Sequence, residues 1–298
     1  KRKYTRYGYL FTIPFVLAFL AFQLYSIIYT FAISFTKLKG WETTLNFIGF
    51  DNYFVLLRNP FFLKAFKNTW IIWGMNFIPQ IVLALLLAHW MTDLKLKIRG
   101  AGLFKVAFYM PNIITAASVS ILFMALFGYP TGPINQLLMQ FGVIDEPYNF
   151  FRSVFVTRGI VAFIQMWMWY GQTFIILSAA ILGINPALYE AAMVDGASSR
   201  HMFFHITLPL IKPVLLYIFV TSLIGGMQMF DIPFLLTNGN PDFAVETMTM
   251  FIYKQAFLGS RNFYMAATAS VALFVIVSVL SLLLFNVFGD KEKGGEDA

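Results

Sequence analysis

Side chains that could catalyse a reaction are few in this chain of 298 residues, and their spacing does not form a catalytic cluster. The sequence has no cysteine, so disulfides, thiolate metal sites and cysteine nucleophiles are excluded. Of the three histidines, His201 and His205 have the i, i+4 spacing of a metal-binding pair. A third ligand is not apparent, so we interpret both as residues on the polar face of a helix. The sequence predicts no metal site and no catalytic site.

The polar side chains are instead concentrated in one segment between two long apolar runs. Residues 189–213 read YEAAMVDGASSRHMFFHITLPLIKP. Asn185 can cap a helix that begins at Pro186, and Gly196 can end that helix in a sharp turn. Ser198 can then begin a second short helix. The segment therefore predicts a helix–turn–helix.

Such a segment has the composition of a docking surface for another protein. Its alanines and glycine permit a partner to approach closely, and the charges of Glu190, Asp195 and Arg200 can fix the partner's orientation. An ordinary connecting loop, helical only because its backbone must be hydrogen bonded, is the alternative.

The composition is that of a membrane protein. Hydrophobic residues make up 59% of the chain and charged residues 12%, whereas a soluble domain has about 25% charged residues. The net charge of +7 could indicate nucleic-acid binding, but the basic residues are scattered at the ends of apolar runs. We interpret them as membrane-flanking charges, and we expect lipid rather than nucleic acid as a partner.

Six apolar stretches are long enough to cross a bilayer, for which about 20 residues are needed. We predict an all-α integral membrane protein with a single membrane domain over residues 1–298. The basic start precedes an apolar run too long for a cleavable signal core, so we expect a retained first helix. The predicted spans are about 8–35, 69–91, 104–128, 158–183, 210–232 and 262–288, with the charged loop at 184–209.

Lysine and arginine near the span ends predict the orientation. Basic residues occur at 1–6, 95–99 and 291–293, and all three groups must share one side if there are six spans. The opposite side also carries basic residues, but at lower density. Both termini and the loop 184–209 are therefore predicted to be cytoplasmic. On the other side, segment 36–68 is predicted to contain a short surface helix, and segments 129–157 and 233–261 to cap the outer opening.

The charged loop also carries a family signature. Glu190-Ala191-Ala192, Gly196 and Ile206-x-Leu208-Pro209 have the spacing of the EAA loop, which marks the membrane subunits of ABC importers. Similar passages include YLFTIPFVLAFLAFQLYSIIYTFAISFT, FYMPNIITAASVSILFMALF and MFDIPFLLTNGNP. Nearly the whole chain resembles the permease subunits of carbohydrate-uptake ABC importers, in particular the maltose-type first permease. TNGNP at 237–241 departs from the resemblance, because relatives usually carry more glycines there.

This resemblance implies a type I ABC importer permease fold in a bacterial inner membrane. It also implies a second homologous permease, two ATPase subunits and an extracytoplasmic solute-binding protein as partners. The sequence contains no G-x-x-x-x-G-K-[ST] phosphate loop, so we expect this chain to bind no cofactor and to be no enzyme, with ATP and Mg²⁺ on the ATPases. The residues expected to couple to the ATPase are Glu190, Ala191, Ala192, Asp195, Gly196, Ala197, Arg200, Ile206, Leu208 and Pro209.

Polar and aromatic side chains inside spans four and five are candidates for the substrate pathway. Gln165, Trp169 and Gln172 lie on one helix face, at i, i+4 and i+7. Gln172 could instead bond across helices, as could Gln228. Trp167 and Trp169 cannot both face the pathway. Aligned by the EAA loop, the resemblance assigns substrate contacts to Gln165, Trp169, Gln172, Gly225, Gly226 and Met229, and we add Gln228.

Three further polar residues lie in the spans, and two other functions are compatible with the sequence. Asn76 and Gln80 form a polar i, i+4 pair in span two, and we interpret them as a packing contact. Asp231 lies near the outer end of its span, where water can reach it. An importer of glycerol-3-phosphate or of another small solute would share the EAA loop. An ion-coupled secondary carrier is less favoured, because the spans hold few charged residues that could bind the coupling ion.

Overall fold

The computed structural model describes residues 2–40, 44–93, 96, 99–259 and 261–288. Within these ranges the chain is almost entirely helical, and its one β-type pairing is an isolated bridge between Thr36 and Phe47. The predicted all-α class is confirmed. Five basic residues on which the predicted orientation partly rests lie outside the described ranges: Lys1, Lys95, Lys97, Lys291 and Lys293.

The apolar runs form long helices, as predicted. Five helical segments among the described residues are long and apolar enough to cross a membrane. Within a helix the backbone N–H and C=O groups bond to one another, as a lipid environment requires. The segments are Tyr9–Ser34, α4 (Pro60–Thr92), α8 (Val154–Leu182), Lys212–Thr237 and Phe263–Val287, the last within α15 (Phe263–Phe288).

The predicted span 104–128 differs from the other five, because its two helices meet at a sharp bend. Helices α5 (Ala101–Ile113) and α6 (Ala116–Leu126) meet at an angle of 89°. Pro111 lies in the last turn of α5, where proline disfavours continuation of a helix. The side chain of Thr115 then caps α6 by accepting from the amide of Ser118 at 3.3 Å. Counted as one broken span, the pair brings the described total to six.

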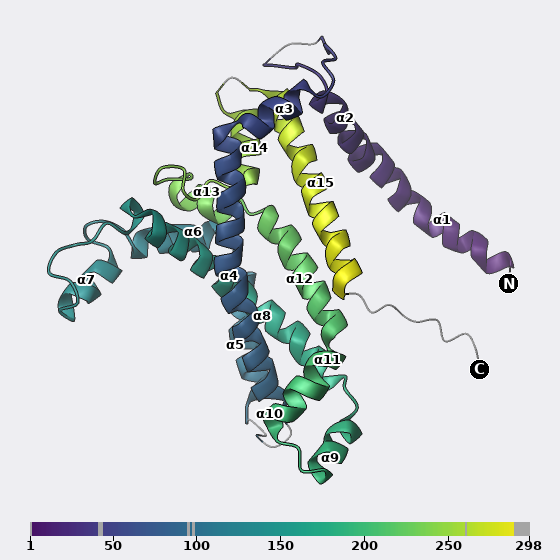
Figure 1. Cartoon of the computed structure of the whole chain (residues 1–298), viewed down its shortest axis with the longest axis vertical. Helices are drawn as coiled ribbons and strands as arrows, with labels where there is room; N and C mark the ends of the chain where they lie inside the picture. Colours follow the sequence, from purple (N-terminus) through teal and green to yellow (C-terminus); the bar gives the residue numbers. More distant parts are fainter. Residues whose placement is uncertain (1, 41–43, 94–95, 97–98, 260, 289–298) are drawn as a thin grey trace. The chain divides into compact units, whose positions relative to one another are not determined.

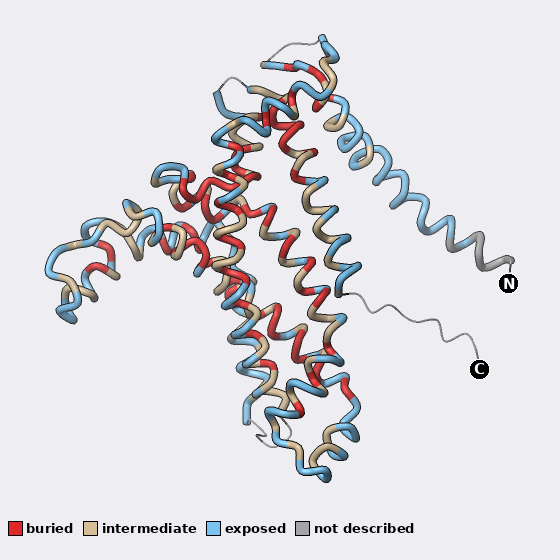
Figure 2. The backbone as a smooth tube through the Cα atoms, in the orientation of Figure 1, coloured by how far each residue is buried: buried red, intermediate tan, exposed pale blue. Residues whose placement is uncertain are grey.

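The chain divides into two compact units, and the first consists of residues 1–63 and 251–275. Its first span is a continuous helical run of α1 (Arg2–Ala18), the π-helix η1 (Phe19–Leu24) and α2 (Tyr25–Ser34). The predicted short helix of segment 36–68 is α3 (Asp51–Arg58), where the side-chain amide of Asn52 donates to the carbonyl of Ser34 at 2.8 Å. Figure 2 shows that the described residues of the first span are mostly exposed.

The second unit, residues 64–250 and 276–298, contains the larger core. Ile72, Val119, Ile164, Ile232 and Val245 belong to one buried cluster that joins α4, α6, α8 and α13 (Asp231–Thr237). These helices carry the concentration of buried residues seen in Figure 2. The other elements of the second unit are α7 (Pro133–Gln140), η2 (Phe150–Arg152), α9 (Pro186–Val194), α10 (Ser199–Met202), η3 (Phe203–Thr207), α11 (Leu208–Leu210) and α12 (Lys212–Met227) (Figure 1). Helix α14 (Met248–Phe257) begins in this unit.

Helices α5 and α8 pack main chain against main chain. Gly171 of α8 is buried, and a Cβ atom built on it would overlap the carbonyl group of Phe108 in α5. Nearby, the side-chain amide of Asn112 donates to the carbonyl of Met168 at 3.3 Å. Small residues at such crossings allow helices in a membrane to approach closely. Gly171 therefore sets the distance between these two helices.

One arginine holds the segment between α13 and α14 against two helices. Arg158 of α8 donates to the carbonyl of Ala244 at 2.9 Å and to the side chain of Asn68 in α4 at 2.6 Å. The amide group of Asn68 in turn donates to the carbonyls of Phe243 and Glu246. Because the carbonyls of Ala244 and Glu246 are buried, this network supplies hydrogen bonds that they need.

We expect Arg158→Met to lower the free energy of unfolding by about 2 kcal/mol, because hydrogen bonds from a charged donor are lost while their acceptors stay buried. Thermal unfolding of the purified protein in detergent measures this change. Arg152→Met is the matched control, since Arg152 is exposed in η2. Equal melting temperatures for the two variants would contradict the role assigned to the network.

Candidate functional site

A cavity of about 400 Å³ opens in the second unit, between α4, α8 and α12. Its wall is completed by the short segment that links α12 to α13, where the backbone leaves the helical path after Met227. Interrupted helices at membrane depth are tolerated where they line a cavity. The cavity is therefore the candidate binding site for a solute.

The structure brings all seven residues predicted for the substrate pathway into the wall of this cavity. Three come from α8, two from α12 and two from the linking segment. They are Gln165, Trp169, Gln172, Gly225, Gly226, Gln228 and Met229. Met229 is also part of the buried core cluster, with 4% of its surface exposed, so it contributes packing as well as lining.

The cavity wall carries free amide groups and an indole ring. In the part of the chain that the structure describes, the side chains of Gln165, Gln172 and Gln228 make no hydrogen bond to another residue. Trp169 is 47% exposed, whereas Trp167 packs against Phe123 with ring centroids 6.0 Å apart. Of these two tryptophans, Trp169 lines the cavity, and Trp167 packs against the core cluster. Cross-helix bonding, the alternative considered for the glutamines, is not observed.

Sequence reasoning underestimated the contribution of α4. Trp73, Asn76 and Gln80 all line the cavity, although Asn76 and Gln80 were interpreted as packing residues. Gln80 does make a packing contact, because its side chain donates to the hydroxyl of Thr173 in α8 at 2.8 Å. The i, i+3, i+7 spacing of these three residues was the signal that could have placed them on one helix face.

The two adjacent glycines of α12 have different roles. A Cβ atom on Gly225 would meet nothing within 4 Å, whereas one on Gly226 would overlap the indole ring of Trp73. That ring cannot easily move, because its N–H group donates to the carbonyl of Ser222 at 3.0 Å and its face stacks on Phe77. Gly226 therefore makes room for a neighbouring helix, and Gly225 leaves room in the cavity.

Alanine substitution should separate these roles. We expect Gly226→Ala to lower the free energy of unfolding by about 1–3 kcal/mol, as overpacking of a fixed side chain does. Gly225→Ala should keep the melting temperature of the wild type, because its methyl group enters open space. Thermal unfolding in detergent compares the pair. A melting temperature that falls more for Gly225→Ala than for Gly226→Ala would refute the assignment.

The charged loop has the predicted helix–turn–helix structure. The side chain of Asn185 accepts from the amide of Ala187 at 3.0 Å and caps α9, and Ser198 accepts from the amide of His201 and caps α10. Between the helices, Gly196 has a φ of +78°, a conformation that favours glycine. Beyond α10 the chain continues through the π-helix η3 into α11.

The charged loop 184–209 is thus a helical hairpin, and its surface combines charge with exposed apolar groups. Glu190, Ala191, Asp195, Gly196, Arg200 and Pro209 are exposed, and Ala192, Ala197, Ile206 and Leu208 are half-buried. Sequence reasoning missed the apolar part, since Leu188, Val194 and Phe204 are 47%, 88% and 51% exposed. Exposed apolar side chains beside charges are typical of a protein-binding surface.

The histidine pair lies on the same hairpin. The rings of His201 and His205 stack with centroids 4.0 Å apart, and both residues are exposed. No group of three or more His, Cys, Asp or Glu side chains that could hold a metal ion occurs among the described residues. We therefore assign no ligand role to the pair.

With this geometry established, comparison with known proteins identifies the family. Residues 69–291 match the model of the binding-protein-dependent transport system inner membrane component. The chain belongs to this family. It is therefore a multi-pass membrane component of a transport system, located in the inner membrane, and the family is not itself catalytic.

Relatives cover nearly the full length of the chain. The lactose transport system permease protein LacF of Rhizobium radiobacter is 33% identical over 96% of this chain and 95% of its own. The arabinooligosaccharides transport system permease protein AraP of Bacillus subtilis is 35% identical over 94% and 88%. A solved bacterial alginate ABC transporter, in complex with a periplasmic protein bound to an alginate pentasaccharide, has a TM-score of 0.78 at 26% identity. That match covers 96% of this chain and 94% of its counterpart.

Proposed function

We propose that this chain is the permease subunit of an ATP-driven, binding-protein-dependent importer of sugars or oligosaccharides, of which it forms half of the translocation pathway. The observation that carries the proposal is the cavity between α4, α8 and α12, into which the structure brings the expected pathway residues. The names of the relatives LacF and AraP, and the alginate transporter, favour a carbohydrate as the solute.

The chemistry of the cavity supports this class of solute. Amide groups donate and accept hydrogen bonds as sugar hydroxyls require, and an indole face offers an apolar surface to a sugar ring. Gln165, Gln172 and Gln228 supply the amides, and Trp169 supplies the exposed indole. The proposed contact residues are therefore the seven already described in the cavity wall.

The charge of the cavity favours an uncharged sugar. Among the described residues that line it, Asp231 alone is acidic, and none is lysine, arginine or histidine. A carboxylate or phosphate on the solute would find no cation in this half of the pathway, and it would be repelled by Asp231. The same charge distribution argues against glycerol-3-phosphate, the alternative solute considered from the sequence.

Energy must come from partner subunits, because the sequence contains no phosphate-binding loop. We infer that two ATPase subunits bind ATP and Mg²⁺, that a second permease completes the pathway, and that an extracytoplasmic binding protein delivers the sugar. The hairpin 184–209 is the proposed contact with an ATPase on the cytoplasmic side. Its exposed mixture of apolar and charged groups supports that role.

The test is ATP hydrolysis by the assembly of both permeases, two ATPases and the binding protein, reconstituted in liposomes. We expect hydrolysis to rise when binding protein is added with a neutral oligosaccharide, because binding outside can shift the assembly toward the conformation in which the ATPases hydrolyse ATP. Uronic-acid oligosaccharides of equal length should stimulate it less. Sugar uptake by this chain without ATPases would refute the proposal and favour a secondary carrier.

A further inference from the structure

Helix α4 connects the two parts of the second unit that the proposed function uses. Trp73, Asn76 and Gln80 line the translocation cavity, and His89 and Asp93 lie at the other end of the helix, beside the hairpin. Between Gln80 and His89 the helix rises about 14 Å, at 1.5 Å per residue. No break occurs in α4 over this distance, so a displacement at one end reaches the other.

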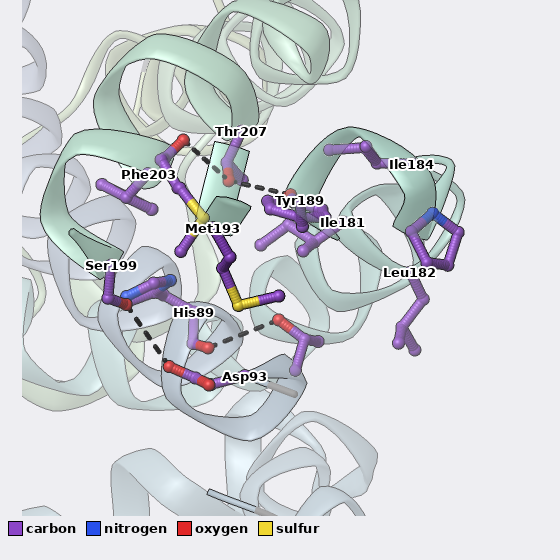
Figure 3. A pocket seen from close by; sticks show the side chains of 13 residues that line it. His89, Asp93, Ile181, Leu182, Ile184, Tyr189, Met193, Ser199, Phe203 and Thr207 are labelled. Carbon is purple, nitrogen blue, oxygen red and sulfur yellow. Dashed lines mark hydrogen bonds between the residues drawn. The ribbon is translucent and has the colours of Figure 1, made fainter. Parts of the chain in front are cut away.

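The hairpin touches this end of α4 through a ring contact and a hydrogen bond. The ring of His89 packs against Phe203, the first residue of η3, with centroids 4.6 Å apart. The hydroxyl of Ser199 donates to the carboxylate of Asp93 at 3.5 Å, which is a long hydrogen bond. Figure 3 shows His89 and Asp93 facing Phe203 and Ser199 across the space between the two segments.

Beside these contacts the interface is not fully packed. A cavity of about 100 Å³ separates the hairpin from the ends of α4 and α8, and Met193 and Tyr189 of α9 lie on its wall. Atoms that face a void have no packing partners there. The hairpin and α4 therefore meet at the rim of the cavity, in the ring contact of His89 with Phe203 and in the long hydrogen bond between Ser199 and Asp93.

A hydrogen bond joins the two halves of the hairpin at the wall of the same cavity. The hydroxyls of Tyr189 in α9 and Thr207 in η3 are 2.9 Å apart, so α9 and the second half of the hairpin are hydrogen bonded to each other (Figure 3). A π-helix such as η3 is rare and occurs frequently at functional sites. A movement of α9 is therefore carried to Phe203.

At its other end, α4 is bonded to the wall of the translocation cavity. Gln80 donates to Thr173 of α8, and Trp73 donates to Ser222 of α12. A movement of α4 consequently shifts the groups that face the solute. The contacts form one continuous series from the hairpin, through Phe203 and His89, to the cavity.

We propose that His89 is a positioning residue, whose ring contact with Phe203 transmits movement of the hairpin to α4 and thereby to the translocation cavity. This inference rests on the proposed function, because it concerns how ATP hydrolysis is coupled to sugar movement. His89 takes no part in hydrolysis or in binding sugar. Its role is to make α4 follow the hairpin.

The test is the amount of neutral oligosaccharide imported per ATP hydrolysed by the reconstituted assembly. We expect His89→Ala to lower this ratio by about fivefold or more, the lower end of coupling between linked sites. His89→Phe should restore it, because a phenyl ring can keep the packing against Phe203. Adding Phe203→Ala to His89→Ala should cause little further loss, since both remove one contact. Leu86→Ala, at a 42% exposed position of α4 outside both cavity walls, should leave the ratio unchanged.

A purely structural role would lower import and hydrolysis together and leave their ratio constant. A wild-type ratio in His89→Ala, or a ratio in His89→Phe as low as that in His89→Ala, would overturn the proposal. If wild-type hydrolysis responds to no oligosaccharide, the proposed function fails rather than this inference.

Cross-linking gives a second measurement that does not depend on the alanine variants. The chain has no cysteine of its own, so His89→Cys with Phe203→Cys introduces the one reactive pair. Because this double substitution removes both rings, it should lower the import ratio as His89→Ala does. A short bifunctional thiol reagent that joins the two positions should restore the ratio, since the hairpin and α4 then move together. A ratio that stays low after complete cross-linking would overturn the proposal.

Discussion

Gly171→Ala should leave little folded protein in the membrane, the largest effect on stability that we expect. The added Cβ atom would overlap the main chain of α5 at Phe108, which cannot rotate away as a side chain can. The two helices must separate, and the packing between them is lost. Overpacking costs about 1–3 kcal/mol even where side chains can adjust, and we expect at least the upper part of that range here. Yield and melting temperature of the purified protein measure it.

The control for this substitution lies on the same helix. A Cβ atom on Gly159 would meet nothing within 4 Å, so Gly159→Ala should preserve or slightly raise the melting temperature. If Gly171→Ala and Gly159→Ala gave equal yields and melting temperatures, the close contact of α5 with α8 would not be required for folding.

Glu190→Lys should abolish the stimulation of ATP hydrolysis by sugar-loaded binding protein, the largest functional effect that we expect. Glu190 is exposed on α9, and it forms no ion pair with another described residue, so its charge is available to a partner. Loss of a charge partner that is buried on binding costs about 2–5 kcal/mol, and charge reversal adds repulsion. Co-purification of the ATPase with the permease, followed by stimulated hydrolysis, measures both consequences.

Two further variants show whether this effect is specific to the hairpin. Glu146→Lys makes the same charge change at an exposed residue outside 184–209, and it should not alter ATPase co-purification. Gly196→Asp should weaken co-purification through the backbone, because a φ of +78° is unfavourable for a residue with a side chain. Undiminished co-purification in Glu190→Lys would remove the hairpin from the proposed ATPase contact.

The local structure of the hairpin could be read directly from the sequence. Asn185, Pro186, Gly196 and Ser198 each act within a few residues of their own position, as a cap, a first turn or a left-handed turn. The same holds for the apolar runs, because a lipid environment leaves a long apolar segment few structures other than a helix. Helical periodicity also placed Gln165, Trp169 and Gln172 on one face, and in the structure all three line one cavity.

What the sequence alone determined about this protein is therefore its class, the approximate extent of its spans and the faces of individual helices. The tertiary structure decided which neighbour covers each face. Only the fold shows that Gly226 lies against Trp73 while Gly225 borders the cavity. It also shows that Trp167 packs on Phe123 and that α5 and α6 meet at 89°. The physical reason is that helical periodicity fixes the direction of each side chain within one helix. Contacts between residues distant in sequence, such as that of His89 with Phe203, depend instead on how the helices pack.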